Sequence, residues 1–283
     1  MRVIKRKKGS EEYYYLQHSF RKDKKVVTRE LYLGKTIPDN IEEAKAKLMV
    51  EAKEQLNKKL ETIGNLFQKE WARIPESAKE KELKEIAIAF TYNTNAIEGS
   101  TITLEEARLI LEDKIAPNRP LKDIRETESH AKVFSIMLRT GEKISKDLLL
   151  KWHKDLFEST KPDIAGRFRD YLVRVGSYAA PDWREIEELM EQLIVFVNES
   201  RLNPVELAAR AHYMFEKTHP FGDGNGRVGR LLMNHILWKR GYPMLIIEYN
   251  RREPYYKALE RTEGGFVNHF IRRYLAVHKK RLQ

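Results

Sequence analysis

Twelve consecutive residues, His219 to Arg230, hold several chemically active side chains in the order HPFGDGNGRVGR. The imidazole of His219 has an ordinary pKa of about 6.5, which suits a general base at neutral pH. The carboxylate of Asp223 is the hard oxygen ligand that Mg²⁺ on a polyphosphate prefers. Arg227 and Arg230 add positive charge, and Asn225 adds amide donors. A base, a metal ligand and anion-binding groups in one segment predict phosphoryl or nucleotidyl transfer.

The elements that must position these groups are two helices joined by a glycine-rich loop. Apolar residues recur at helical spacing over 205–215, and Pro220 must end that helix. Apolar periodicity resumes at Val228, and Gly241 suits the position after a helix C-terminus. Three glycines between the helices allow positive φ and a close backbone approach. The N-terminus of the second helix then presents free N–H groups and the positive end of its dipole, a ready site for phosphate.

Each residue of the segment has a plainer explanation when it is taken alone. A single histidine after a helix is usually structural, and Asp223 could form an Asx turn or cap a helix. Their combination within twelve residues favours the chemical interpretation. Four further histidines lack the paired spacing of a zinc site, so we expect no zinc there: His130, His153, His212 and His235.

The composition is typical of a helix-rich globular protein. Of the 283 residues, 34% are charged and 41% hydrophobic, which argues against collagen, mucin or a wholly disordered chain. The absence of cysteine excludes a disulfide scaffold, Cys-ligated zinc, iron–sulfur clusters and thiol nucleophiles. The net charge of +11 favours acidic partners such as nucleotides, nucleic acid or an acidic protein, or it reflects only a solvated basic surface.

Residues 1–36 are expected to form a small basic β segment. Aromatic and β-branched runs at 13–16 and 25–28 flank the polar stretch 21–25, a pattern typical of a hairpin or meander. Up to residue 35 the segment has eleven Lys and Arg against four Asp and Glu. It could either pack against the rest of the chain or serve as an interaction patch.

Helical spacing of apolar residues dominates the rest of the chain. One helix is expected over 42–71 and a second from Ser77 to a stop at Gly99, with Pro75 between them. Thr103 begins a capping box, TLEE, before the next helix. Further helices are expected at about 122–140, 145–158, 182–200, 204–218, 226–240 and 253–280. A segment at 166–181 breaks the helical rhythm and predicts a strand or hairpin.

No stretch reaches the roughly 18 apolar residues that a membrane span needs. The basic first residues also lack the apolar stretch of a secretory signal. We therefore expect no membrane contact and a cytoplasmic location.

Residues 219–230 match the HPFx(D/E)GNGRxxR signature of Fic domain proteins at every fixed position. They do not resemble the Doc-type kinase branch, whose loop has Ala and Lys at positions 224 and 227. The resemblance extends over residues 91–283. It implies a mainly α fold, a Fic-type helical bundle with a β-hairpin flap at 166–181. The β segment 1–36 and helices over 37–90 would precede this Fic domain.

The resemblance implies a protein adenylyltransferase. His219 would deprotonate a Ser, Thr or Tyr hydroxyl of a target protein, which attacks the α-phosphorus of ATP while Asp223 holds Mg²⁺. Arg230 would hold the γ-phosphate. The anion cradle would consist of Gly224, Asn225, Gly226 and Arg227. The flap would cover the nucleotide and align the target through Val175, Gly176, Ser177 and Tyr178. The adenosine side would be lined by Tyr255 and Tyr256. An asparagine that some relatives have near the base is Glu263 here.

A second motif, TNAIEG at 94–99, resembles the (S/T)xxxE(G/N) inhibitory motif of Fic proteins. It lies N-terminal to the core, in an inhibitory helix over 91–99, which is the class II arrangement. Glu98 could pair with Arg230, which then could not hold the γ-phosphate. Alternatively, Glu98 is a surface residue at a helix end.

Two other functions stay open. In some class II relatives the same glutamate positions a water and the enzyme removes AMP, so a de-AMPylase is one alternative. A regulator that binds nucleotide or nucleic acid through its basic ends is the other. Many relatives dimerise, so a homodimer is a further expectation.

Overall fold

The structure is a computed structural model that describes residues 1–22 and 25–283 of the chain. It divides into two compact units, Met1–Glu61 and Thr62–Gln283. The division falls inside the long helix α1 (Ile41–Arg73). The segments that we expected from the sequence end at other residues, 36 and 90, and as domains they stay a prediction.

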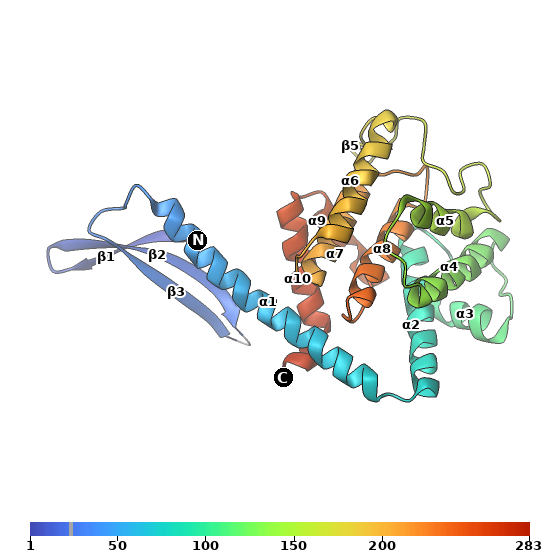
Figure 1. The fold of residues 1–283 in the computed structure, drawn as a ribbon, viewed down its shortest axis with the longest axis horizontal. Coiled ribbons are helices and arrows are strands. Elements are labelled where there is room, and N and C mark those ends of the chain that lie inside the picture. The colour runs from blue at the N-terminus through green and yellow to red at the C-terminus, as the bar shows by residue number, and fades with distance from the viewer. Residues whose placement is uncertain (23–24) are drawn as a thin grey trace. The chain divides into compact units, whose positions relative to one another are not determined.

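The first unit contains a three-stranded antiparallel sheet, seen as the blue arrows of Figure 1. Its strands follow one another in the order β1 (Arg2–Lys8), β2 (Glu11–Lys22) and β3 (Lys25–Gly34). The expected meander is thereby confirmed. Part of the polar turn expected at 21–25, residues 23 and 24, lies outside the described residues.

One face of this sheet is covered. Leu16 in the middle of β2 is fully buried, and so nearly is Leu48 in the first half of α1. Val3 and Leu31 pair with Leu16 on the neighbouring strands and therefore share its face. This apolar face supplies the hydrophobic core of the first unit.

The second unit is a bundle of helices (Figure 1), which confirms the mainly α fold. A short hairpin of β4 (Arg174–Val175) and β5 (Tyr178–Ala179) interrupts it. In chain order the helices are α2 (Glu76–Ile97), α3 (Leu104–Arg108), the π-helix η1 (Leu109–Asp113), α4 (Leu121–Arg139), α5 (Lys146–Phe157), η2 (Trp183–Glu185), α6 (Ile186–Glu199), α7 (Pro204–Thr218), α8 (Asn225–Lys239), η3 (Tyr249–Arg251), α9 (Arg252–Leu259), α10 (Glu263–Val277) and η4 (Lys279–Leu282).

Local sequence signals set several of these helix ends. Pro75 lies at the N-cap of α2, and Thr103 forms the expected capping box with Glu106. Gly99 and Gly241 follow the ends of α2 and α8 with φ of +91° and +74°. A left-handed residue at these positions ends a helix because it turns the chain away from the helical path.

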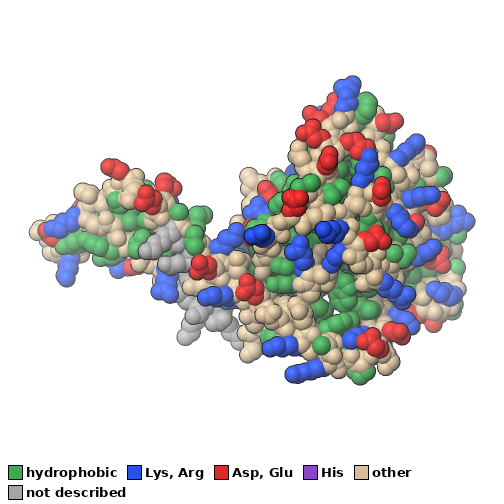
Figure 2. All heavy atoms as spheres, in the orientation of Figure 1, with side chains coloured by type: hydrophobic (Ala, Val, Ile, Leu, Met, Phe, Trp, Pro, Cys, Tyr) green, Lys and Arg blue, Asp and Glu red, His purple; other side chains and the backbone are tan. Residues whose placement is uncertain are grey.

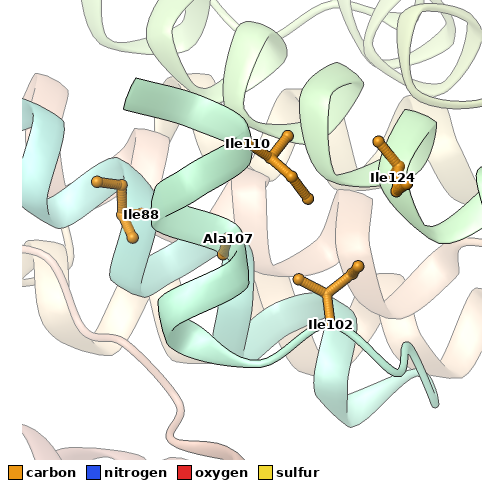
Figure 3. Close-up of a cluster of buried hydrophobic side chains, with 5 residues drawn as sticks. All are labelled: Ile88, Ile102, Ala107, Ile110 and Ile124. Carbon is orange, nitrogen blue, oxygen red and sulfur yellow. The ribbon is translucent and has the colours of Figure 1, made fainter. Parts of the chain in front are cut away.

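Helix α8 lies at the centre of the second unit. Twelve of its 15 residues are buried, so its position is fixed by packing on nearly every side. A smaller apolar cluster, drawn in Figure 3, joins the middle of α2 to α3 and α4 and consists of Ile88, Ile102, Ala107, Ile110 and Ile124.

Two expectations about secondary structure need correction. The single helix expected at 253–280 is wrong, because α9 and α10 are separate helices. The first ends at Leu259, and Thr262 caps the second, since its hydroxyl accepts the N–H of Gly265 at 3.3 Å. The hairpin expected over 166–181 is present, but its strands are only two residues long.

The surface of the second unit is mixed in charge. On the face drawn in Figure 2, Lys and Arg side chains alternate with Asp and Glu. Among the helices of residues 1–22 and 25–283, none is both long and apolar enough to cross a lipid bilayer. The cytoplasmic location stays a prediction.

Candidate active site

The loop that joins α7 to α8 has a sharply bent backbone. His219 itself is left-handed, with φ 49° and ψ 58°, and its N–H donates to Phe215 O at 2.9 Å. This conformation is uncommon for a residue other than glycine, and it turns the imidazole away from the axis of α7. Of the three glycines in the loop region, only Gly224 has a positive φ, +80°. A side chain at Gly224 would also collide with the ring of Phe157.

Asn225 holds this loop in shape. Its Oδ1 accepts the N–H of Phe221 at 2.8 Å and its Nδ2 donates to Phe221 O at 2.8 Å. Both groups are buried, so these bonds are costly to lose. The side-chain amide of Asn225 thus uses its oxygen and one of its two N–H donors on the loop, and its part in an anion cradle stays a prediction. Its backbone N–H, at the start of α8, still faces the helix N-terminus.

His219 is half-buried, and its Nδ1 is among the buried atoms. The nitrogen left to face a substrate is Nε2. Burial lowers the pKa of His219, the bond to the Glu216 backbone partly opposes this, and the charge of Arg169 lowers the pKa further. The net shift is downward, so the imidazole is neutral at pH 7 and ready to accept a proton.

Arg169 is a site residue that the sequence analysis missed. It is 4% exposed, and its hydrogen bonds go to carbonyl oxygens. Its Nε donates to His219 O at 2.9 Å, its Nη1 to Tyr171 O at 2.6 Å, and its Nη2 to Pro181 O at 2.8 Å. The backbone N–H of Arg169 donates to Pro220 O at 2.9 Å. One side chain thus ties both ends of the flap to the loop.

A cluster of charges lies beside the N-terminus of α8. Arg227 is buried and forms an ion pair with Glu126 of α4. Asp223 pairs with Lys161, whose Nζ is also 3.5 Å from Glu126 Oε1. Burial alone would raise the pKa of the Asp223 carboxyl, but the bond from Lys161 and the charges of Lys161 and Arg227 bring it below its ordinary value.

This cluster borders a cavity of about 120 Å³. Charged side chains line most of it, including Glu98, Lys122, Asp123, Lys161, Asp223 and Arg227. Glu126 and Lys161 are not indicated by the sequence. They are 101 and 62 residues from their partners in the chain, and no local pattern marks such pairs.

Arg230 is the most deeply buried charged side chain of the site. Its side chain is 1% exposed, and one Nη2 donates to Glu98 Oε1 at 2.6 Å. Nε donates to Thr94 Oγ1 at 2.5 Å, and Nη2 also reaches Thr94 O at 3.2 Å. Burial works to lower the pKa of Arg230, but the charge of Glu98 and its hydrogen bond raise it above the ordinary value. The pairing expected from the TNAIEG motif is present.

Glu98 lies directly against the first turn of α8. A Cβ added to Gly226 would collide with Glu98 Oε1 and would be 2.8 Å from Arg230 Nη1. The N–H groups of Asn225, Gly226 and Arg227 belong to this first turn and have no partner within the helix. The structure therefore brings a carboxylate to the place where an anion would meet the helix N-terminus.

The flap residues lie outside this charged cluster. Val175 is 45% exposed, and Gly176 turns the hairpin with φ +59°. Tyr178 is partly buried because its hydroxyl donates to Lys217 O at 3.0 Å. Ser177 lies in the turn, where the Arg174 guanidinium reaches its carbonyl at 3.5 Å. The tip of the flap is thus open to a partner chain.

The two tyrosines expected to line an adenosine site differ. Tyr255 is only 4% exposed, and its hydroxyl bonds to His212 Nε2 at 2.9 Å. It belongs to the core in this conformation, and a place for it beside adenosine stays a prediction. Tyr256 is 42% exposed, and its hydroxyl donates to Ile97 O at 3.3 Å, next to Glu98.

A buried carboxyl, Glu216, lies on the inner side of the site. Burial raises the pKa of Glu216 to about 7, although the charge of Arg230 opposes that shift. Its Oε1 is 3.9 Å from His212 Nε2. Arg230 thus feels two carboxyl groups, Glu98, which it contacts and which is partly exposed, and Glu216, whose pKa its charge lowers.

The remaining histidines and Glu263 have structural contacts. His153 stacks on Phe221 with ring centroids 3.9 Å apart, and its Nε2 is 3.0 Å from Asp223 O. Glu263 pairs with Arg210 at 2.7 Å at the start of α10. No group of three His, Asp or Glu suited to a metal ion occurs in the described parts of the chain.

Comparisons with known proteins place these features in context. Residues 143–237 match the family described as Fic/DOC. The chain is 34% identical over 200 residues to protein adenylyltransferase Fic of Nematostella vectensis, covering 68% of this chain and 47% of that protein. It is 32% identical over 234 residues to protein adenylyltransferase fic-1 of Caenorhabditis briggsae, covering 79% and 46%. The chain spans about half the length of these relatives.

Solved structures have the same fold. Fic-1 from C. elegans superposes with a TM-score of 0.71 at 26% identity, over 87% of this chain and 78% of that chain. A Fic domain containing signaling protein from Bacteroides thetaiotaomicron superposes with a TM-score of 0.67 at 23% identity, over 80% and 97%, which is a likeness of fold alone.

Proposed function

This chain belongs to the Fic/DOC family, and from that membership we propose that it is a protein adenylyltransferase. It transfers AMP from ATP to a Ser, Thr or Tyr hydroxyl of a target protein. The observation that carries the proposal is the meeting, at the N-terminus of α8, of the neutral imidazole of His219, the carboxylate of Asp223 and the two buried guanidinium groups of Arg227 and Arg230. The names of the relatives support the same activity.

In the proposed reaction the target hydroxyl attacks the α-phosphorus of ATP. Nε2 of His219 accepts the hydroxyl proton, the new O–P bond forms, and the bond from the α-phosphorus to the bridging oxygen breaks. Pyrophosphate leaves with that oxygen. The N–H groups at the start of α8 and the charges of Arg227 and Arg230 stabilise the negative charge on the phosphates, and such fixed dipoles are usually the largest catalytic contribution.

Asp223 is the residue that would hold Mg²⁺. The ammonium of Lys161 lies beside its carboxylate, which marks that place as suited to a cation. A single carboxylate is sufficient, because Mg²⁺ usually binds one or two carboxylates together with substrate phosphates. When bound, Mg²⁺ would neutralise charge on the leaving pyrophosphate.

Arg169 is proposed as a positioning residue. By bonding to His219 O, Tyr171 O and Pro181 O, it fixes the flap relative to the imidazole. The flap tip, including Val175 and Gly176, would align the target as an added strand. The charge of Arg169 also favours the neutral form of the base.

Glu98 is proposed to inhibit this activity. Its carboxylate occupies the N-terminus of α8 and one Nη of Arg230, the group that would hold the γ-phosphate. ATP and Glu98 therefore compete for one guanidinium. Removal of the carboxylate frees a charge-assisted hydrogen bond of about 1.5 to 3 kcal/mol, which implies a rise in activity of about 10- to 100-fold.

Labelled ATP tests the transfer and the inhibition together. Purified wild type, Glu98→Gly and the double variant Glu98→Gly/His219→Ala are incubated with ATP labelled at either the α- or the γ-phosphorus, and label on the protein is measured. We expect strong labelling of Glu98→Gly from the α position only. The double variant should lose about 10²- to 10⁴-fold of it, the usual contribution of a general base.

The matched control is Glu82→Gly, an exposed glutamate of the same helix α2. It places a glycine inside the helix, at a cost of about 1 kcal/mol, but leaves the carboxylate of Glu98, so its labelling should stay at the wild-type level. Labelling from the γ position would mean phosphate transfer instead. Labelling that survives His219→Ala would remove His219 from the role of base.

Removal of AMP is a second candidate function, because the carboxylate of Glu98 is 27% exposed and therefore accessible to water. Wild type would then release AMP from a labelled target, and Glu98→Gly would not. The partner that either function requires is a target protein with an accessible hydroxyl. The homodimer stays a prediction.

A further inference from the structure

The sheet of the first unit has a second face that the proposed function does not use. Successive side chains of a strand point to opposite faces, and paired residues share one face. By the register of the strands, Arg2 and Arg6 of β1 lie on the same face as Tyr13 and Tyr15 of β2 and Tyr32 of β3. We call these five residues the aromatic–basic face.

This face is the open one. Leu16 is fully buried and has the opposite orientation on β2, so the covered side of the sheet is the other side. Tyr32, by contrast, is 54% exposed. Such an exposed aromatic side chain among the residues of this face is typical of a recognition surface and unusual for a side chain that only packs in a core.

The tyrosine rings form a cluster with a guanidinium. The ring of Tyr32 lies 5.3 Å from that of Tyr15 and 6.1 Å from that of Tyr13, centroid to centroid. The guanidinium of Arg6 lies 5.2 Å from the centroid of the Tyr15 ring. Planar rings beside a planar cation are the groups on which nucleic-acid bases stack.

A row of polar side chains crosses the same face. Arg2 donates to Gln17 at 2.8 Å, and Gln17 donates to Glu30 at 2.9 Å. Arg6 also donates to Glu30, at 2.8 Å. One carboxylate is thus shared along a row that contains two guanidinium groups. Such a row has a net positive charge. It also has amide and guanidinium donors that can bind base edges and phosphates.

The net charge is concentrated in the same segment. Residues 1–35 have eleven Lys and Arg against four Asp and Glu, so they carry +7 of the net +11, and the other 248 residues carry only +4. Four of the basic residues occur in the sequence between 21 and 25, where β2 passes to β3. In Figure 2 Lys and Arg side chains of this unit border a hydrophobic stretch.

We propose that the aromatic–basic face binds nucleic acid. Arg2 and Arg6 contact phosphates, and the tyrosines and Gln17 contact bases. An acidic protein would complement the positive charge but would leave the row of planar groups without partners. Protein–protein interfaces depend instead on apolar anchors that fill pockets. The proposal is independent of adenylyl transfer, which rests on residues of the second unit.

Binding of labelled oligonucleotides to the full chain tests the proposal. Fluorescence anisotropy is measured with a 20-base-pair DNA duplex and with 20-nucleotide single strands of DNA and RNA, between 50 and 200 mM salt. We expect saturable binding to at least one of them, with a slope of log affinity against log salt of about −3 or steeper, because each phosphate contact contributes about −0.7 to −0.9.

Two double variants probe the face itself. Arg2→Gln/Arg6→Gln should weaken binding by about tenfold or more and flatten the slope by about two. Tyr15→Leu/Tyr32→Leu should weaken binding by about five- to 100-fold with an unchanged slope, because stacking does not release counterions. Circular dichroism checks that the strands persist, and Tyr32→Leu alone serves where the double variant does not fold.

The matched control removes the same charge elsewhere. Lys279→Gln/Lys280→Gln changes two exposed lysines of η4 and should alter the affinity less than twofold. Equal weakening by both charge variants would overturn the proposal, since total charge would then explain the binding. So would the absence of saturable binding at 50 mM salt, or binding of polyglutamate by a chain that binds none of the oligonucleotides.

Discussion

The loop of the candidate site and the segments that cover it are held in different ways. Buried contacts fix the loop from several sides, with Asn225 bonded twice to Phe221 and Arg169 bonded to His219 O. The cover, by which we mean the flap tip and Glu98, is held by fewer contacts. Val175 at the flap tip is 45% exposed, and the carboxylate of Glu98 is held through Arg230. The reacting groups are thus fixed in place, whereas access to them depends on contacts that are easily exchanged.

The largest expected effect comes from loosening the loop. In the Glu98→Gly background, Asn225→Ala removes two buried hydrogen bonds and leaves the backbone of Phe221 without partners, which costs about 2 to 4 kcal/mol. Adenylyl transfer should fall by about 100-fold. The matched change in the cover, Val175→Ala, should lower transfer less than about threefold. Equal losses in the two variants would contradict the distinction between a fixed loop and an adjustable cover.

A smaller effect is expected at Arg169, which joins the loop to the flap. Arg169→Gln loses the bonds to the flap and the charge that lowers the pKa of His219. Transfer should fall by about tenfold. The group must be neutral to act as a base, so the acid limb of the profile of kcat/KM against pH should move to higher pH. A fall in activity with an unmoved acid limb would limit Arg169 to positioning the flap.

A contact of the cover should have a still smaller effect. Thr94→Val removes the hydroxyl that accepts from Arg230 Nε at 2.5 Å and leaves Glu98 in place. Since the guanidinium is then less firmly aligned with Glu98, we expect labelling to rise about threefold. In the Glu98→Gly background the same change should produce no rise. A rise of similar size in both backgrounds would show that Thr94 acts independently of Glu98.

The last prediction concerns the stability of the fold and leaves activity aside. The pKa of Glu216 is about 7 in the folded protein against an ordinary 4.5, so the folded state binds more protons than the unfolded state between these values. Stability therefore falls as the pH rises from 4.5 to 7 and changes no further above it. The free energy of unfolding of Glu216→Gln, relative to wild type, should rise over this range by up to about 3 kcal/mol. Urea unfolding at pH 5 and pH 8 measures it.

Local signals in the sequence predicted most elements of the second unit. Pro204 begins α7 within the helix expected at 204–218, and Thr103 caps α3 as its spacing with Glu106 indicates. Thr262 is a comparable signal for the start of a helix. Apolar residues at helical spacing on both sides of it nevertheless indicate one continuous helix. Helix ends depend on the residues next to them, which is why a sequence can indicate them.

The contacts that complete the site could not be predicted in the same way. Arg169 and Glu126 bond to groups 50 and 101 residues away, and only the packing of α4 and the flap against α8 brings them there. The inward position of Tyr255 likewise depends on its bond to His212, 43 residues away. Asn225 was found, but its side chain serves the loop, because a short polar side chain next to a bend can satisfy the backbone there.

The absence of a side chain at Gly226 leaves a space that one carboxylate oxygen of Glu98 fills. If Glu98 inhibits as proposed, a triphosphate that reached Arg230 would need that same space, and Glu98 would act as a competitive ligand tethered to its own receptor. Its effective concentration depends on how firmly the last turn of α2 is formed. Anything that frays this turn, whether heat, a substitution or a binding partner, would lower the ATP concentration at which the nucleotide displaces it.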